Sequence, residues 1–260
     1  MEKWLEQVKE GWNQTSDSAW YQSLRTKERI DALVGRPESA FHPSVFELLK
    51  KYLNDFNGKK ILLPSSGDNH AAFAMALLGA EVTSADISQR QLENAQAIAD
   101  QLGLSIRFVC EDTMKLAAIE SEAFDLVYTS NGTHSWILNL NTMYTQIDRV
   151  LKPGGFSMMY DVHPFHRPFT DEPWRAPQIR KSYFDGPDEL HWRMQDLVNA
   201  MSNAGLRIKE MAELPAVDAS FWFTYDELIG QKADVLKDIN DWKQNPMAAL
   251  PVWLTIVAQK

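Results

Sequence analysis

The sequence KKILLPSSGDNHAAFAMALLGAEVTSADIS, residues 59–88, decides how the rest of the chain is interpreted. Its residues 61–63 form a short apolar run of the kind found in a strand that is buried on both faces. A helix of small side chains begins at His70 and closes at Gly79, and residues 81–85 return as a second strand. The stretch therefore predicts a strand–turn–helix–strand unit of a parallel sheet.

The turn between the first strand and the helix has the composition of a ligand-binding loop. Residues 64–69, PSSGDN, combine turn formers with small side chains, so a ligand can approach the backbone closely. The helix that follows directs free amide groups and the positive end of its dipole toward this turn. Asp86 lies 19 residues after Gly67, where a carboxylate is placed to accept hydrogen bonds from the ribose hydroxyls of a nucleoside.

Strands and helices alternate along the remaining chain, which implies right-handed crossovers between parallel strands. Ligands bind at the carboxyl ends of such strands, so residues that are distant in sequence meet at one edge of the sheet. The further strands are predicted over residues 104–109, 124–129, 156–160, 206–211 and 252–258.

Hydrophobic periodicity also predicts helices outside the opening unit. They are expected near residues 4–12, 20–33, 42–54, 88–102, 115–122, 140–147 and 188–205, the last capped by Asp188 with Leu190 on its inner face. Residues 152–155, KPGG, are predicted to form a turn before the fifth strand.

Three further motifs follow the opening unit in order. They are Cys110-Glu111-Asp112-Thr113, FDLVY at residues 124–128 and RVLKPGG at residues 149–155. With residues 59–88, this series resembles class I S-adenosylmethionine-dependent methyltransferases over roughly residues 58–162. A lone glycine-rich turn is weak evidence, whereas four ordered motifs at these spacings are specific. The resemblance implies a Rossmann-like α/β fold with S-adenosyl-L-methionine as cofactor. Its seven-stranded, mostly parallel sheet has helices on both faces and a last strand inserted antiparallel beside the fifth.

The first motif departs from the usual family pattern. Leu63 stands where the family usually has an acidic residue, and a leucine cannot bond to the ammonium group of a ligand. Ser65 and Asn69 stand where the family has glycines. Serine is small and asparagine tolerates a positive φ, so both are compatible with the turn.

The resemblance implies a set of cofactor-binding residues at the strand ends. Asp86 would hold the ribose, Ile87 would pack on adenine, and Asp112 would accept a bond from the adenine amino group. The turn after the first strand would lie against the methionine part, and the residues after the fourth strand would border the sulfonium. The full set is Ser65, Ser66, Gly67, Asn69, Asp86, Ile87, Asp112, Thr113, Ser130 and Asn131.

The catalytic candidates are His134, Asp161 and His163. His134 is expected next to the methyl group, and histidine has an ordinary pKa near neutrality, which suits a general base. The alternative for His134 and for His163 is a structural role in which the ring is hydrogen-bonded to the backbone. His166 with His163 and Asp161 is a weak metal pattern on a proline-broken loop, so no metal is expected.

Composition limits the classes of partner and the compartment. The chain has 260 residues with a net charge of −9, so an acidic surface disfavours nucleic acid as a partner. One cysteine, Cys110, fits a reducing compartment. Neither a membrane span nor a signal peptide is recognised, which predicts a cytoplasmic protein without membrane contact. Oligomeric state is left open.

The chain is predicted to contain an N-terminal helical cap and one large domain. Residues 1–57 precede the first strand, and residues 58–260 form the cofactor-binding methyltransferase domain. Two irregular insertions interrupt that domain, at about 163–187, where a lid is expected after the fifth strand, and at about 213–250. Tryptophans in the cap either pack it onto the sheet domain or wall a substrate pocket.

The predicted function is methyl transfer from S-adenosylmethionine to a small-molecule acceptor. One alternative is a nucleoside-binding or S-adenosylmethionine-binding protein without turnover, which the departures at Leu63 and at the motif glycines motivate. The other is a nicotinamide-dependent oxidoreductase on a similar sheet. RVLKPGG and the lack of a full G-x-G-x-x-G pattern argue against this last class.

Overall fold

The computed structural model describes residues 2–67, 69–169, 177–184, 191–223, 227–228 and 233–260. Within these residues a seven-stranded sheet has the order β3-β2-β1-β4-β5-β7-β6. The first five strands pair in parallel, and β7 runs antiparallel to both β5 and β6. The predicted α/β sheet with an antiparallel last strand is therefore confirmed. The strands are β1 Lys60–Pro64, β2 Glu81–Asp86, β3 Ile106–Cys110, β4 Phe124–Ser130, β5 Leu151–Val162, β6 Arg207–Leu214 and β7 Trp253–Gln259.

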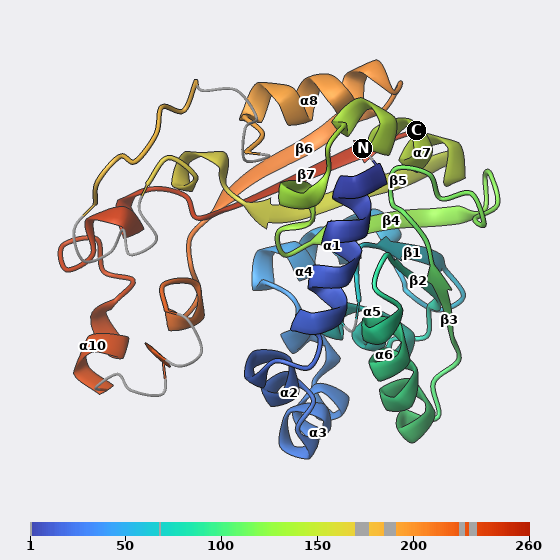
Figure 1. Cartoon of the computed structure of the whole chain (residues 1–260), viewed down its shortest axis with the longest axis horizontal. Coiled ribbons are helices and arrows are strands. Elements are labelled where there is room, and N and C mark those ends of the chain that lie inside the picture. The colour runs from blue at the N-terminus through green and yellow to red at the C-terminus, as the bar shows by residue number, and fades with distance from the viewer. Residues whose placement is uncertain (1, 68, 170–176, 185–190, 224–226, 229–232) are drawn as a thin grey trace.

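Helices cover both faces of the sheet (Figure 1). On one face lie α4 Pro43–Leu53, α5 His70–Leu77 and α6 Gln89–Leu102, and on the other lie α7 Leu140–Val150 and α8 Met194–Asn203. Leu63 belongs to the first of these two cores and Leu62 to the second, and both side chains are at most 1% exposed. Burial on both faces is the reason why the β1 sequence is uniformly apolar.

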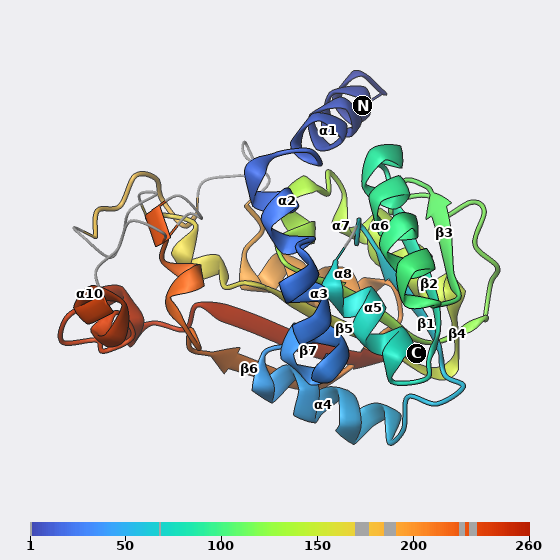
Figure 2. The same cartoon turned by 90° about the horizontal axis from the view of Figure 1, so that it is seen from below.

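The N-terminal helices are α1 Glu2–Thr15, α2 Ala19–Leu24 and α3 Lys27–Gly35, followed by a 3-10 turn at Pro37–Ala40. The prediction of a single helix over 20–33 is wrong because Thr26 starts a new helix. Its hydroxyl accepts a hydrogen bond from the Arg29 N–H, which satisfies a free amide of α3. Figure 2 shows α3 beside α5, so the cap continues the helical layer on that face.

The predicted helix over 115–122 is also wrong, since these residues form turns. Leu116 and Glu122 have positive φ values of 43° and 52°, which an α-helix does not accommodate. Arg149 holds the turns in place by donating hydrogen bonds to the carbonyls of Leu116 and Ile119. A residue from the RVLKPGG motif thus decides the conformation of a distant connection.

The KPGG sequence lies inside β5 instead of before it. Leu151 pairs with Phe124 and Phe156 pairs with Leu126, so residues 152–155 bulge out between these two pairings. A Cβ at Gly155 would lie 3.0 Å from the carbonyl oxygens of both Lys152 and Phe124, so glycine permits the close approach.

The two insertions are described in part. The first holds a 3-10 turn at Pro164–His166 and an isolated bridge between Phe169 and Ile179, whereas Arg175, Asp188 and Leu190 lie outside the described residues. Residues 191–193 are not helical and α8 begins at Met194 with Arg193 as its N-cap, so the helix predicted from residue 188 starts later than expected. The second insertion holds α10 Ala233–Asp238 and 3-10 turns at Ala219–Phe221 and Pro246–Ala249.

A third, smaller core joins the two insertions beside the β6–β7 side of the sheet (Figure 1). Trp222 is buried in it, Phe169 packs against it, and the rings of His166 and Phe221 meet at 5.2 Å. Across the described ranges, no helix has the length and apolar character needed to cross a membrane.

Candidate active site

The carboxyl ends of four parallel strands bring the predicted cofactor residues to one edge of the sheet. In the register of β1 and β2, Pro64 lies opposite Ala85, and in that of β2 and β3, Asp86 lies opposite Cys110. The turn after β1, the Asp86-Ile87 pair and the Asp112-Thr113 pair therefore stand side by side. Ser130 and Asn131 end β4, the neighbour of β1 on its other side.

Hydroxyl groups connect the turn after β1 to the adjacent strands. The Ser65 and Thr113 hydroxyl oxygens lie 2.7 Å apart, and the Ser66 and Ser84 oxygens lie 2.5 Å apart. The Ser66 N–H also donates to the Ala85 carbonyl. The predicted residues Ser65, Ser66 and Thr113 thus form one bonded layer at the strand ends.

Asn69 does not adopt the positive φ that its place in the glycine motif suggested. Its φ is −60°, and it is the N-cap of α5, where its side-chain oxygen accepts from the Ala71 N–H at 2.9 Å. Its Nδ2 donates to the Ser130 hydroxyl at 3.0 Å, which joins the ends of β1 and β4. The left-handed position is taken by Ser65, with φ of 51°, and by Gly67, with φ of 52°.

The two predicted acidic residues are largely buried and differ in their bonding. Asp86 is 8% exposed, and its Oδ1 accepts from the Ser88 N–H at 2.7 Å. Asp112 Oδ1 accepts from the Met114 N–H at 2.9 Å. Its other oxygen, Oδ2, is buried with no hydrogen-bond partner in the described part of the chain, and the Lys115 ammonium lies 3.8 Å away. Asp112 can therefore accept a hydrogen bond from a ligand.

Gln91 was recognised in the sequence only as the last residue of a capping box, SQRQ. The Ser88 hydroxyl does accept from the Gln91 N–H, but the Gln91 side chain turns toward Gly67. A Cβ on Gly67 would lie 1.6 Å from Gln91 Oε1, so the amide occupies the space that any side chain at Gly67 needs. Gln91 Nε2 is buried and has no hydrogen-bond partner among the described residues.

His134 and Asp161 lie together in a buried hydrogen-bonded chain. His134 Nδ1 lies 2.7 Å from Asp161 Oδ2, and His134 Nε2 lies 2.7 Å from the Tyr144 hydroxyl. The backbone N–H groups of His134 and Val162 also donate to Asp161. Burial opposes ionisation of Asp161, but the bond and charge of His134, together with Arg167, lower its pKa overall. Both ring nitrogens of His134 are thus engaged within the protein.

Tyr144 is the third member of this hydrogen-bonded series, and the sequence predicted it only as a core residue. Burial raises its pKa well above the ordinary value, so the hydroxyl keeps its proton and donates it in a hydrogen bond. Its position on the inner face of α7 gave no signal of a polar role.

His163 bonds to a different partner. It is fully buried, its Nδ1 accepts from the Phe165 N–H, and its Nε2 lies 3.0 Å from Glu213 Oε1 at the end of β6. Burial lowers the pKa of His163, and the bond to Glu213 acts against this effect. In the described residues, no group of three His, Cys, Asp or Glu side chains has an arrangement that could hold a metal ion.

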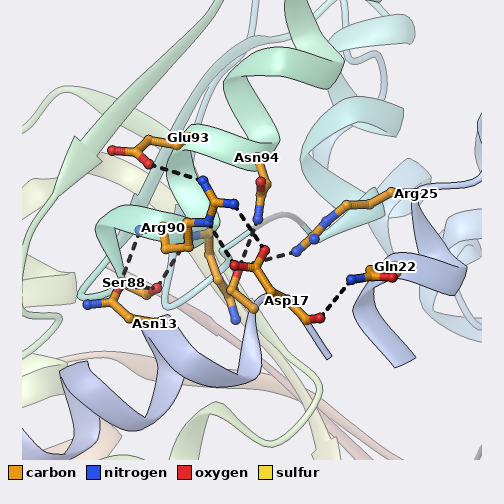
Figure 3. Close-up of polar contacts among 10 residues, drawn as sticks. Asn13, Asp17, Gln22, Arg25, Ser88, Arg90, Glu93 and Asn94 are labelled. Carbon is orange, nitrogen blue, oxygen red and sulfur yellow. Dashed lines mark hydrogen bonds and ion pairs between the residues drawn. The ribbon is translucent and has the colours of Figure 1, made fainter. Parts of the chain in front are cut away.

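The α1–α2 connection closes onto the start of α6, directly beside Asp86. The Asn13 side-chain oxygen accepts from the Ser88 hydroxyl and from the Arg90 N–H, at 2.9 and 3.2 Å. Asp17 pairs with the Arg90 guanidinium, and Figure 3 shows these side chains converging from the two helices. The ring of Trp12 lies 5.2 Å from that of Trp136, so the cap also reaches the segment that follows β4.

A hollow of about 650 Å³ lies at the opposite edge of the sheet, away from the predicted site residues. The amino ends of β1–β4 line it, including Lys60, Glu81, Arg107 and Phe124. Ligands of doubly wound sheets bind at the carboxyl edge, and none of the predicted site residues lines this hollow. The carboxyl edge is therefore the candidate active site.

Comparison with known proteins points to one family. A methyltransferase domain family matches residues 63–159. An uncharacterized methyltransferase of Synechocystis sp., sll0829, is 30% identical over 154 residues, which cover 58% of this chain and 68% of that protein. The uncharacterized methyltransferase YbaJ of Bacillus subtilis is 29% identical over 115 residues, which cover 44% of this chain and 45% of that protein.

Solved structures share the fold at low sequence identity. An S-adenosylmethionine-dependent methyltransferase from Mesorhizobium loti has a TM-score of 0.62 and 19% identity, with 83% of this chain and 97% of that chain covered. Geranyl diphosphate C-methyltransferase from Streptomyces coelicolor A3(2), solved with S-adenosyl-L-homocysteine, has a TM-score of 0.59 and 14% identity, with 98% and 97% covered.

The chain therefore belongs to the methyltransferase family. Solved structures that share its fold include S-adenosylmethionine-dependent methyltransferases. The resemblance inferred from the four motifs is confirmed by these matches, as is the Rossmann-like fold.

Proposed function

We propose that this protein transfers a methyl group from S-adenosylmethionine to a small-molecule acceptor at the carboxyl edge of β1–β5. The observation that carries this proposal is the buried Asp112 Oδ2, which has no hydrogen-bond partner among the described residues and lies at the strand next to Asp86. A buried acceptor without a donor costs about 1–3 kcal/mol. The amino group of adenine is a donor that would remove this cost, and Asp86 would then bind the ribose.

The remaining cofactor contacts follow from the same edge. Ile87 would pack on adenine beside Thr113, and the turn after β1 would face the methionine part. The residues proposed to bind the cofactor are Ser65, Ser66, Gly67, Asn69, Asp86, Ile87, Asp112, Thr113, Ser130 and Asn131.

The chain's own residues would position the acceptor, exclude water and move its proton. When bound, S-adenosylmethionine supplies the electrophilic methyl group. We propose that His134 receives the acceptor proton at Nε2 once the Tyr144 hydroxyl turns away. Asp161 would hold Nδ1–H and stabilise the resulting imidazolium. His163, whose Nε2 contacts Glu213, is the second candidate for this role.

The acceptor is proposed to be small because of the charge and the coverage of the site. A net charge of −9 repels nucleic acid, and this acidic, low-cysteine composition fits the cytoplasm. Residues 1–57 are proposed to act as a cap over the domain of residues 58–260. That domain holds insertions at about 163–187 and 213–250, and the first of them is proposed as a lid over the acceptor.

Calorimetric titration with S-adenosylhomocysteine and, separately, with NAD tests the cofactor site. We expect only the first to bind, and we expect Asp112→Asn to weaken this binding by about tenfold, because a buried hydrogen bond is lost. Asp100→Asn, an exposed substitution on α6, is the matched control and should leave the affinity unchanged. Binding of NAD alone would contradict the proposal.

A labelled-methyl assay over a library of metabolites tests turnover. Transfer of label to at least one small molecule is expected. Tight binding of S-adenosylhomocysteine together with inactivity across the library would instead favour a cofactor-binding protein without turnover.

A further inference from the structure

A small cavity lies beside the His134–Asp161 pair, at the end of β5. Its volume is about 20 Å³, enough for a group of one to a few atoms. We call it the Arg167 cavity; its lining includes His134, Ser135, Asp161, Arg167, Trp192 and Leu197.

The Arg167 guanidinium is largely withdrawn from water and does not donate a hydrogen bond to any of the described residues in return. Its side chain is 26% exposed, and no acceptor in the described part of the chain lies within hydrogen-bond distance of it. The nearest anion is Asp161, whose Oδ1 lies 3.8 Å from Nη2. Both Asp161 oxygens already accept hydrogen bonds, from the Val162 N–H and from His134.

Electrostatics agree with this picture of an incompletely compensated cation. Burial lowers the pKa of Arg167, and the charge of Asp161 opposes this effect while Arg180 adds to it. A buried guanidinium needs acceptors for its planar fork of N–H groups, and a carboxylate matches that fork with two parallel bonds.

The rest of the lining adds one hydroxyl group and several apolar surfaces. The Ser135 hydroxyl has no side-chain partner among the described residues and adds a donor next to Arg167. Leu197 and Pro164 are apolar, and the Trp192 N–H is used in a bond to the Ile137 carbonyl, so its ring presents carbon surface. The volume admits only the anionic head group of a ligand, so the rest of the molecule would extend out of the cavity.

We propose that the methyl acceptor is a small organic acid, and that its carboxylate binds to Arg167 and the Ser135 hydroxyl in the Arg167 cavity. This inference rests on the proposed function, because His134 borders both the cavity and the end of β4 that would face the methyl group. A carboxylate fits better than a phosphate for two reasons. The cavity is small, and Asp161 already offsets part of the single positive charge of Arg167, so the second negative charge of a dianion would lack a counter-charge.

The test is a set of binding titrations with the full chain, with and without S-adenosylhomocysteine. The probes are pairs of aliphatic and aromatic carboxylic acids with their neutral amides, for example benzoate with benzamide and phenylacetate with phenylacetamide, and phenyl phosphate as the dianionic arm. We expect at least one acid to bind about tenfold more tightly than its amide, since charge-assisted bonds are stronger than neutral ones. Phenyl phosphate should bind more weakly than benzoate.

Variants assign the effect to the cavity. Arg167→Gln should reduce the preference for acid over amide to about twofold or less, and Ser135→Ala should reduce it partially. Arg180→Gln removes the same charge from an exposed position of the same insertion and should preserve most of the preference. Unfolding curves show whether Arg167→Gln is folded; if it is not, Ser135→Ala and Arg167→Lys decide the assignment.

Three results would overturn the inference. They are equal binding of every acid and its amide, a preference that survives Arg167→Gln in folded protein, and tighter binding of phenyl phosphate. Failure of the proposed function is a separate result, because it appears as a lack of S-adenosylhomocysteine binding. The acid–amide comparison in cofactor-free protein is still informative in that case.

Discussion

Replacement of Gly67 by alanine tests how the turn after β1 is packed. Gly67 has φ of 52°, and an alanine there pays about 1 kcal/mol or more for a left-handed backbone. The new Cβ would also lie 1.6 Å from Gln91 Oε1 and 2.8 Å from its Cδ, so the amide has to leave its buried place. Loss of that packing adds about 1 kcal/mol. We expect Gly67→Ala to lower the free energy of unfolding by about 2–3 kcal/mol in total.

The Gln91→Ala variant separates the two contributions. By itself Gln91→Ala removes apolar packing, which lowers stability. It also removes a buried Nε2 that has no partner among the described residues, which raises stability. The two effects oppose each other, so the free energy of unfolding should change by no more than about 1 kcal/mol. In the double variant the collision no longer exists and only the backbone strain remains. The two substitutions should therefore be less than additive, by about 1 kcal/mol.

Urea unfolding of the four proteins, followed by circular dichroism, measures this coupling. Calorimetry with S-adenosylhomocysteine on the same proteins shows whether the turn also sets cofactor affinity. Additive free energies would refute the reasoning, because they would mean that Gln91 does not occupy the space next to Gly67.

Three further predictions concern the cofactor, the pH dependence of stability and the cap. Asp86→Ala should weaken binding of S-adenosylhomocysteine by about 1–3 kcal/mol in calorimetry, because bonds to buried hydroxyls are lost, and an unchanged dissociation constant would remove Asp86 from the site. Burial lowers the pKa of His166 from 6.5 to about 4, so the unfolded chain binds more protons between these values and the free energy of unfolding falls as the pH is lowered from 6.5 to 4. The loss due to His166 should approach about 3 kcal/mol in urea titrations, and the fall should be smaller in His166→Phe, where the lowered pKa values of His163 and His42 still contribute. Arg90→Gln should speed dissociation of S-adenosylhomocysteine in stopped-flow experiments, since the Asp17 contact holds the cap beside Asp86. High salt should diminish this difference, because both side chains of the ion pair are about half exposed, and equal rates at low salt would contradict it.

The sequence predicted the fold correctly where a local pattern is compatible with only one kind of secondary structure. The apolar run at 61–63 predicted β1, because burial on both faces is visible in neighbouring residues. The start of β5 was predicted at residue 156 instead of Leu151, because the pairing of Leu151 with Phe124 depends on a distant strand. The helix predicted over 115–122 failed for the opposite reason. Arg149, far along the chain, fixes those turns through hydrogen bonds that no local pattern reveals.

The same distinction applies to the candidate site. The topology rule placed Asp86, Asp112 and Ser130 at one edge, because it depends only on where strands end. The left-handed backbone of Ser65 and the hydrogen bond between Tyr144 and His134 depend on side chains meeting in three dimensions. Tyr144 was recognisable as a core residue from its helical spacing, but its hydroxyl had no visible partner in the sequence.

Docking of α1 has a consequence for the order in which the protein matures. Asn13 is synthesised before its partners Ser88 and Arg90, which follow more than seventy positions later. The first helix therefore waits, exposed, until the second strand and the helix after it have formed. Until then chaperones and proteases can reach this segment, and it becomes protected only when the sheet behind it is in place.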